Sequence, residues 1–121
     1  MAGDTSWIYA VTDDGKRHKI GHSCDIRRRL ATFQTGHADQ LRLTSAFAVP
    51  RAKARAMEEY IHKDIGHRRI RREIFAISEE EVRRLFSWAE IRLVEDPLIG
   101  GPVPPDWSPP AITRDGRIVE A

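Results

Sequence analysis

The sequence predicts an α+β fold, with a small three-stranded antiparallel sheet flanked by helices and a proline-rich C-terminal tail. Segments rich in β-branched and aromatic residues occur at 7–12, 17–21 and 41–49 and predict strands. Helical patterns with clear start signals lie between and after them. Residues 97–110 hold six of the seven prolines, which is typical of an extended segment outside a core.

The first two strands are expected to form a hairpin around the turn at residues 13–15. A two-residue loop would pair Tyr9 with Ile20, whereas a three-residue loop with Gly15 left-handed would pair Tyr9 with Lys19. We prefer the second register because it separates an apolar from a polar face. Its apolar face holds Ile8, Ala10 and Ile20, and its other face holds Tyr9, Arg17 and Lys19.

A capping signal and an alternating pattern predict the next two elements. Asp25 is a good N-cap for a helix that ends near Phe33. Residues 41–49 predict the third strand, one side of which would carry Leu41, Leu43, Ser45 and Phe47.

Two longer helices are expected in the second half of the chain. Pro50 can occupy the first turn of a helix that runs to about Ile65. Ser78 begins a capping box with Glu81, which opens a helix to about Ile91. Between these helices, residues 73–77 could form a short extended segment.

The length of 121 residues suggests one domain, which we place at residues 1–96 and follow with a Pro/Gly-rich tail at 97–121. A terminal turn is expected at 114–117. The single cysteine, Cys24, excludes an intrachain disulfide and a multi-cysteine zinc site, and fits a reducing compartment. The N-terminus lacks a signal-peptide pattern, and no apolar run approaches the roughly 20 residues that span a bilayer. We therefore expect a cytoplasmic protein with no membrane partner.

Charge is distributed unevenly along the chain. Residues 1–72 carry 15 Lys/Arg and 8 Asp/Glu, whereas residues 73–121 carry 5 and 10. A basic N-terminal part suits a polyanionic partner, because Lys and Arg on phosphates release condensed counterions. Arg-rich helices with solvated faces would explain the same distribution equally well.

Helical periodicity singles out one polar side chain in each of the first two helices. Arg29 lies about 60° from the apolar stripe of its helix, while Arg27 and Arg28 point further out. In the second helix Glu58 lies next to the apolar stripe and Glu59 lies nearly opposite. Glu58 is therefore the expected half-buried carboxylate, and without further information a structural pair with His62 or an arginine would be favoured.

A series of short motifs resembles the GIY-YIG nuclease superfamily, in its phage-type DNA-binding branch, whose second motif often reads Lys-Ile-Gly. The resemblance covers residues 7 to about 77. It is carried by Ile8-Tyr9, Lys19-Ile20-Gly21, Ser23, Asp25, Arg29-Leu30, Phe33-Gln34-Thr35-Gly36, Glu58, Ile61, His62 and Arg72-Glu73-Ile74-Phe75.

This resemblance implies a GIY-YIG-like fold and hydrolysis of phosphodiester bonds with one Mg²⁺ or Mn²⁺ ion held by Glu58. Arg29 would stabilise charge on the scissile phosphate. Tyr9 would act as general base toward water, and a neighbouring Lys19 would help it to ionise. His62 would position water or contact phosphate, with a structural histidine as an equal alternative.

The expected partner is DNA, with RNA as an alternative. A homodimer is also expected, since a single nuclease site often needs a second copy to cut both strands. Besides the catalytic set, eight basic residues are candidate phosphate contacts: Arg27, Arg28, Arg51, Lys53, Arg68, Arg69, Arg71 and Arg72.

Two positions depart from the family pattern. Lys19 replaces the second motif's tyrosine, and Phe33 stands where many of these nucleases have histidine or tyrosine. Both changes remove groups that handle protons, so a catalytically weak or inactive DNA-binding module is an alternative to the endonuclease. A third alternative is a regulatory protein-interaction domain, whose tail around Trp107 docks on a partner or folds back.

Overall fold

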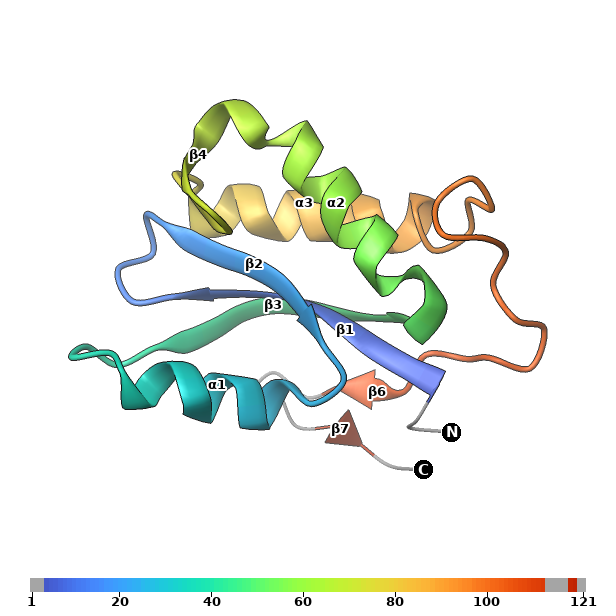
Figure 1. The fold of residues 1–121 in the computed structure, drawn as a ribbon, viewed down its shortest axis with the longest axis horizontal. Helices are drawn as coiled ribbons and strands as arrows, with labels where there is room; N and C mark the ends of the chain where they lie inside the picture. Colours follow the sequence, from blue (N-terminus) through green and yellow to red (C-terminus); the bar gives the residue numbers. More distant parts are fainter. Residues whose placement is uncertain (1–3, 113–117, 120–121) are drawn as a thin grey trace.

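One antiparallel sheet with helices on both faces forms the fold (Figure 1). The computed structural model describes residues 4–112 and 118–119. The sheet order is β3-β1-β2-β5-β4, with strands β1 Thr5–Thr12, β2 His18–Ser23, β3 Arg42–Pro50, β4 Arg69–Arg71 and β5 Ile74–Phe75. The helices are α1 Ile26–Thr35, α2 Ala54–Asp64 and α3 Glu79–Arg92. Short 3₁₀ turns lie at Arg51–Lys53 and Gly66–Arg68, and a small hairpin pairs β6 Ala111–Ile112 with β7 Ile118–Val119.

The predicted α+β class is confirmed, but the sheet has five strands instead of three. β5 lies within the short extended segment expected at 73–77, whereas β4 was not expected. The two strands are short and lie on either side of Arg72, which has a positive φ of 48°. Their hydrogen bonds depend on a distant partner, because β5 pairs with β2. A charged sequence such as residues 68–73 gives no strand signal by itself.

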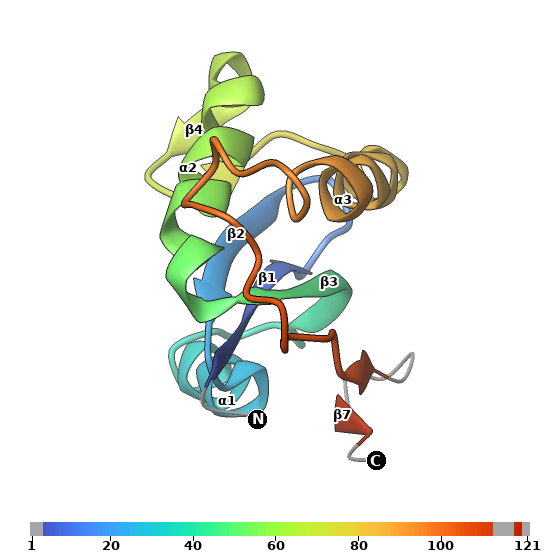
Figure 2. The ribbon, with the colours of Figure 1, turned by 90° about the vertical axis from the view of Figure 1, so that its right-hand side faces the viewer.

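Helix α1 covers one face of the sheet, and α2 and α3 cover the other (Figures 1 and 2). Ile8, Ala10 and Ile20 are buried toward α2 and α3, whereas Trp7 and Tyr9 belong to a second cluster that includes Ile26 of α1. This alternation confirms the predicted division of the hairpin into two faces.

The predicted pairing of Tyr9 with Lys19 is wrong, because Tyr9 pairs with Gly21 and Lys19 pairs with Val11. The loop is longer than expected since side chains close it. Thr12 Oγ1 donates to the Arg17 carbonyl at 2.6 Å, and the Asp14 carboxylate accepts backbone N–H groups beyond it. The shift is two residues, so each side chain keeps its face.

The predicted single face of β3 is also wrong. The β1–β3 register shifts between Ala10 and Val11, so that Ala10 pairs with Ser45 and Val11 with Leu43. Leu43 therefore packs in the α1 cluster, while Phe47 packs in the α2/α3 cluster. A bulge of one residue reverses the faces of a strand, which alternation in the sequence does not reveal.

The helix starts follow the capping signals at two of three places. The Asp25 side chain accepts from the Arg28 backbone N–H at 3.1 Å, and the Ser78–Glu81 capping box is present. The expected start at Pro50 is wrong, because Pro50 ends β3 and a 3₁₀ turn precedes α2.

The proline-rich segment contacts the domain closely, and the expectation that it lies outside the core is wrong at Ile99. The buried Lys53 ammonium donates to the carbonyls of Asp96 and Gly101, at 2.6 and 2.7 Å. The Trp107 indole N–H donates to Thr5 Oγ1 at 2.9 Å. The turn expected at 114–117 lies outside the described residues.

Within the part of the chain that the structure describes, no helix is long and apolar enough to cross a bilayer.

Candidate functional site

The second half of β2 provides an open edge on which the candidate site is built. β5 pairs with β2 only at His18 and Lys19, so within the described residues Gly21 has strand β1 on one side and no strand on the other. The Tyr9 ring lies against Gly21. A Cβ atom at position 21 would lie 2.7 Å from the Tyr9 hydroxyl oxygen, which explains why glycine is needed at this crossing.

Three charged residues act electrostatically on the Tyr9 hydroxyl. Tyr9 is only 2% exposed, and burial raises its pKa well above the ordinary value of a tyrosine. The Arg29 charge lowers this pKa, whereas the charges of Glu73 and Glu58 raise it. Side chains from α1 and α2 therefore influence a tyrosine of β1 through their charges.

The expectation that Lys19 lies directly beside Tyr9 is wrong, because Lys19 pairs with Val11, and the cation that lowers the pKa of Tyr9 is Arg29. The Lys19 ammonium lies 4.3 Å from the centroid of the Phe33 ring and 3.8 Å from a Glu73 carboxylate oxygen. The register shift accounts for this position, since it places Lys19 opposite Val11, two residue pairs from Tyr9 toward the hairpin loop.

Phe33 is the hydrophobic contact that these polar groups share. The Phe33 ring centroid lies 6.2 Å from the Tyr9 ring centroid. The Arg29 guanidinium carbon lies 6.0 Å from the Phe33 centroid. Together with Lys19, this makes a half-buried aromatic ring with two cations near it, an arrangement stabilised by cation–π attraction. Phe33, which cannot take up or release a proton, thus contacts the charged side chains of Lys19 and Arg29.

Glu58 is 8% exposed and reaches the site from α2. The His22 Nδ1–H donates a hydrogen bond to its carboxylate, and His62 Nε2 lies 3.7 Å from the other carboxylate oxygen. Burial raises the pKa of Glu58, and the hydrogen bond from His22 opposes that increase. The carboxylate therefore lies in a setting that would favour an added cation.

The His62 ring is fixed by the backbone. Its Nε2–H donates to the Ile20 carbonyl at 2.8 Å, and its centroid lies 4.9 Å from that of Phe75. These contacts favour the structural alternative for His62, in which it holds α2 against β2 beside Glu58.

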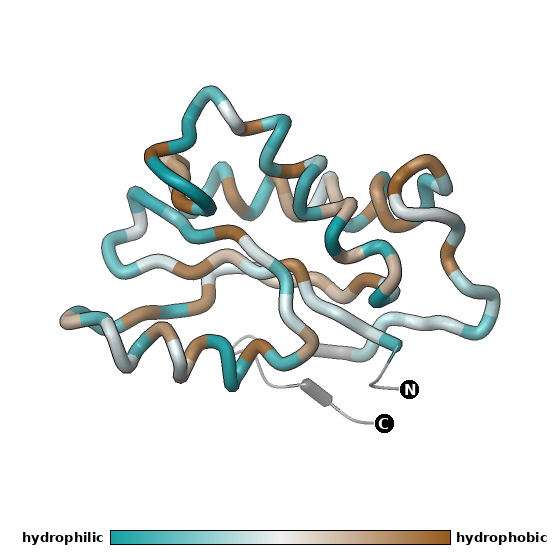
Figure 3. The backbone as a smooth tube through the Cα atoms, viewed as in Figure 1, coloured by the Kyte–Doolittle hydropathy of each residue, from teal (hydrophilic) through white to brown (hydrophobic). Residues whose placement is uncertain are grey.

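The candidate phosphate contacts fall into three groups. The expectation for Lys53 is wrong, because its side chain is fully buried and binds backbone carbonyls. Arg68 forms a two-pronged ion pair with Glu81, one bond of which measures 3.1 Å. The remaining candidates are exposed: Arg27, Arg28, Arg51, Arg69, Arg71 and Arg72. Figure 3 shows the hydrophilic character of the segment around β4 that carries the last three.

Comparison with protein families decides the classification. The T5orf172 domain model matches residues 6–90, which include strands β2 to β5 and all of β1 except its first residue. The chain belongs to the T5orf172 domain family. This is a phage-associated domain of the endonuclease type, which suggests a nuclease or DNA-binding module. No curated protein and no solved structure matches the chain significantly.

Among the described residues of this T5orf172 domain, one group of three offers ligand atoms within 4.8 Å of one another: Asp13, His37 and Asp39. It lies in the loops beside the hairpin turn, apart from Glu58, and it is largely exposed. Glu58 is not part of a comparable cluster in the described residues, so a metal there would depend on water and substrate oxygens for its other ligands.

The sequence left open whether His22, just after the second motif, lines the cleft; it gave Phe33 only as a departure from the family pattern and gave Glu73 no role. The signal for His22 was its spacing of two residues from Ile20, which places it on the α2 face of β2. The position of Glu73 depends on the β5–β2 pairing, where its carbonyl accepts from the Ile20 N–H at 3.0 Å. Sequence spacing gives no comparable signal for that contact.

Proposed function

We propose that this T5orf172 domain is a DNA endonuclease that hydrolyses phosphodiester bonds with one divalent ion at Glu58. The observation that carries the proposal is that the charges of Arg29 and Glu58 both act on the Tyr9 hydroxyl, which lies against Gly21 at the open edge of β2. A hydroxyl, a guanidinium and a nearly buried carboxylate are the groups that a phosphodiester hydrolase of this kind requires.

The donor set at Glu58 fits a hard divalent cation. A single carboxylate, completed by waters and phosphate oxygens, is a usual way to hold Mg²⁺. Burial leaves this carboxylate less well solvated than an exposed one, as its raised pKa indicates. When bound, the ion would supply Lewis-acid stabilisation of the phosphate oxygens.

The chain's own residues have separate roles in this proposal. Arg29 stabilises the charge that develops on the scissile phosphate. Tyr9 keeps its proton in the free protein, because burial raises its pKa, and its hydroxyl orients the attacking water. Neutralising the charge of Glu58 would lower the pKa of Tyr9, since that charge now raises it. Lys19 and the exposed arginines bind flanking phosphates.

Plasmid nicking by matched glutamate variants tests the site. Wild type, Glu58→Ala and Glu59→Ala are incubated with supercoiled plasmid, with Mg²⁺, Mn²⁺ or chelator. Glu59 is the control because it neighbours Glu58 on α2 but is exposed and pairs with the exposed Arg55, at 3.3 Å. We expect metal-dependent nicking by wild type and Glu59→Ala, and none by Glu58→Ala, which still binds DNA. Cutting by Glu58→Ala at the wild-type rate would overturn the assignment.

A non-catalytic DNA-binding module is the second candidate. Two observations favour it: the Glu58 carboxylate already has a hydrogen-bond donor in His22, and the pKa of Tyr9 is raised, which opposes a role as base. This function predicts salt-dependent DNA binding with no cleavage by the wild type under any of the metal conditions.

A further inference from the structure

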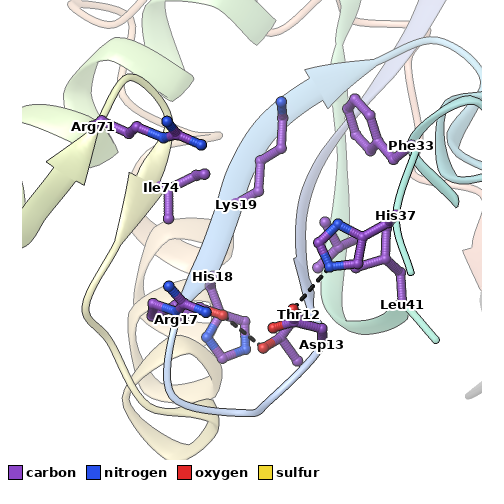
Figure 4. Close-up of a pocket in the computed structure, with 11 residues that line it drawn as sticks. Thr12, Asp13, Arg17, His18, Lys19, Phe33, His37, Leu41, Arg71 and Ile74 are labelled. Carbon is purple, nitrogen blue, oxygen red and sulfur yellow. Dashed lines mark hydrogen bonds and ion pairs between the residues drawn. The ribbon is translucent and has the colours of Figure 1, made fainter. Parts of the chain in front are cut away.

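A groove of about 410 Å³ lies beside the candidate site, on the α1 face of the sheet. In Figure 4 the Lys19 side chain rises from β2 between two walls. Phe33, His37 and Leu41 form one wall, and Arg71 and Ile74 form the other. This volume is in the lower part of the range of about 300–1,000 Å³ typical of small-molecule sites. The groove therefore suits one small organic group and is too small for a duplex.

The charges around the groove favour an anion. Arg17, Lys19 and Arg71 line it, against one carboxylate, Asp13. Arg17 and Lys19 have carboxylates at 3.3 and 3.8 Å, but these pairs are partly exposed to solvent, which weakens such ion pairs. A phosphate group can therefore compete for both cations.

The walls also offer surfaces for a flat ring. Phe33, Leu41 and Ile74 are half-buried apolar residues on opposite sides of Lys19. Asp13 accepts a hydrogen bond from His37 Nε2 at 2.8 Å, which holds the pKa of Asp13 below its usual value. This carboxylate can accept from an amino group on a base edge. Cations, apolar walls and an acceptor together match a nucleotide.

We propose that this groove holds one unpaired nucleotide of the bound nucleic acid. The preferred substrate is then DNA with an unpaired nucleotide, at a bulge or a strand end, and not an uninterrupted duplex. The groove is continuous with the candidate site, because Lys19 and Phe33 belong to both. The inference rests on the proposed function for the identity of the polymer, but it does not require cleavage.

The test compares two DNA duplexes of the same sequence, one fully paired and one with a single bulged 2-aminopurine, in chelator so that cleavage plays no part. We expect wild type to bind the bulged duplex about tenfold more tightly, the order expected when one base packs on protein side chains. The 2-aminopurine fluorescence should change on binding. Leu41→Glu should abolish the preference, whereas the control Leu98→Glu, at a position 91% exposed and outside the groove, should retain it.

Three results would overturn the inference: equal affinity of wild type for the two duplexes, a preference that survives in folded Leu41→Glu, or no DNA binding at all. If Leu41→Glu does not fold, Arg71→Ala takes its place, with Arg92→Ala of α3 as control, because both arginines are exposed. Arg71→Ala should reduce the preference at least threefold, and an unchanged preference would count against the groove. Absence of DNA binding would also contradict the proposed function. Absence of nicking in the plasmid assay would not affect this binding test.

Discussion

Replacing Gly21 by alanine should destabilise the protein through Tyr9. The added Cβ would lie 2.7 Å from the Tyr9 hydroxyl oxygen and 3.0 Å from ring carbon Cζ. Tyr9 is 2% exposed and packs against Phe33, so its ring has little room to move. Overpacking of this kind costs about 1–3 kcal/mol. The lower backbone entropy of alanine in the unfolded chain offsets about 0.4–1 kcal/mol of that. A net loss of about 1–2 kcal/mol is expected.

A double-mutant cycle with Tyr9→Phe isolates the contact. Phenylalanine removes the oxygen at 2.7 Å, so the closest remaining contact is the one at 3.0 Å. Gly21→Ala should therefore cost about 1 kcal/mol less in the Tyr9→Phe background than in wild type, within the range of coupling between touching residues. Urea denaturation monitored by fluorescence measures both costs, provided that the m-value stays constant.

Equal costs in the two backgrounds would refute this reasoning, because they would show that the hydroxyl does not press on position 21. A neutral Gly21→Ala substitution would refute it as well. If the cycle behaves as expected, the glycine of the second motif is explained by the passage of Tyr9 across β2.

Three further predictions concern stability. Lys53→Met should lower the free energy of unfolding by about 2–4 kcal/mol, because two buried carbonyls lose a charged donor. The control Lys63→Met, at an exposed position, should change it by less than about 0.5 kcal/mol. Phe86→Ala should cost about 3–5 kcal/mol in the same urea assay, since this core ring packs edge-on against the Phe47 ring, with the two centroids 5.4 Å apart. A cost below about 1 kcal/mol would contradict that packing. The hydrogen bond from Arg68 lowers the pKa of Glu81 to about 2. The ionised Glu81 therefore stabilises the folded protein fully above its unfolded-state pKa of about 4.5, and this stabilisation is lost as pH falls toward 2. Arg68→Gln should reduce this pH dependence in thermal melts, and an unchanged profile would exclude the ion pair as its cause.

Local signals predicted the helices and the faces of the first hairpin. Asp25 and the Ser78–Glu81 box mark helix starts through bonds within one turn, so a few residues suffice to locate them. The predicted faces of the hairpin were correct although the predicted register was wrong by two residues, because side chains alternate between faces with a period of two along a strand.

The failures have a common origin in contacts between distant residues. The bulge that separates Leu43 from Phe47 depends on how β3 meets β1. Lys53 was expected at the surface because lysine usually lies there, but the carbonyls of Asp96 and Gly101 accept from it inside the protein. The cation next to Tyr9 could not be chosen without the register, which made Arg29 the neighbour in place of Lys19.

The sequence by itself determined the α+β class, two of the three helix starts and the selection of Glu58 over Glu59, because period and capping are local properties. Only the tertiary structure decided that Phe33 supports two cations, that His22 donates to Glu58, and that a groove opens beside Lys19. These features join side chains from separate elements. Their distances are set by strand pairing and helix packing, which no single segment of the chain encodes.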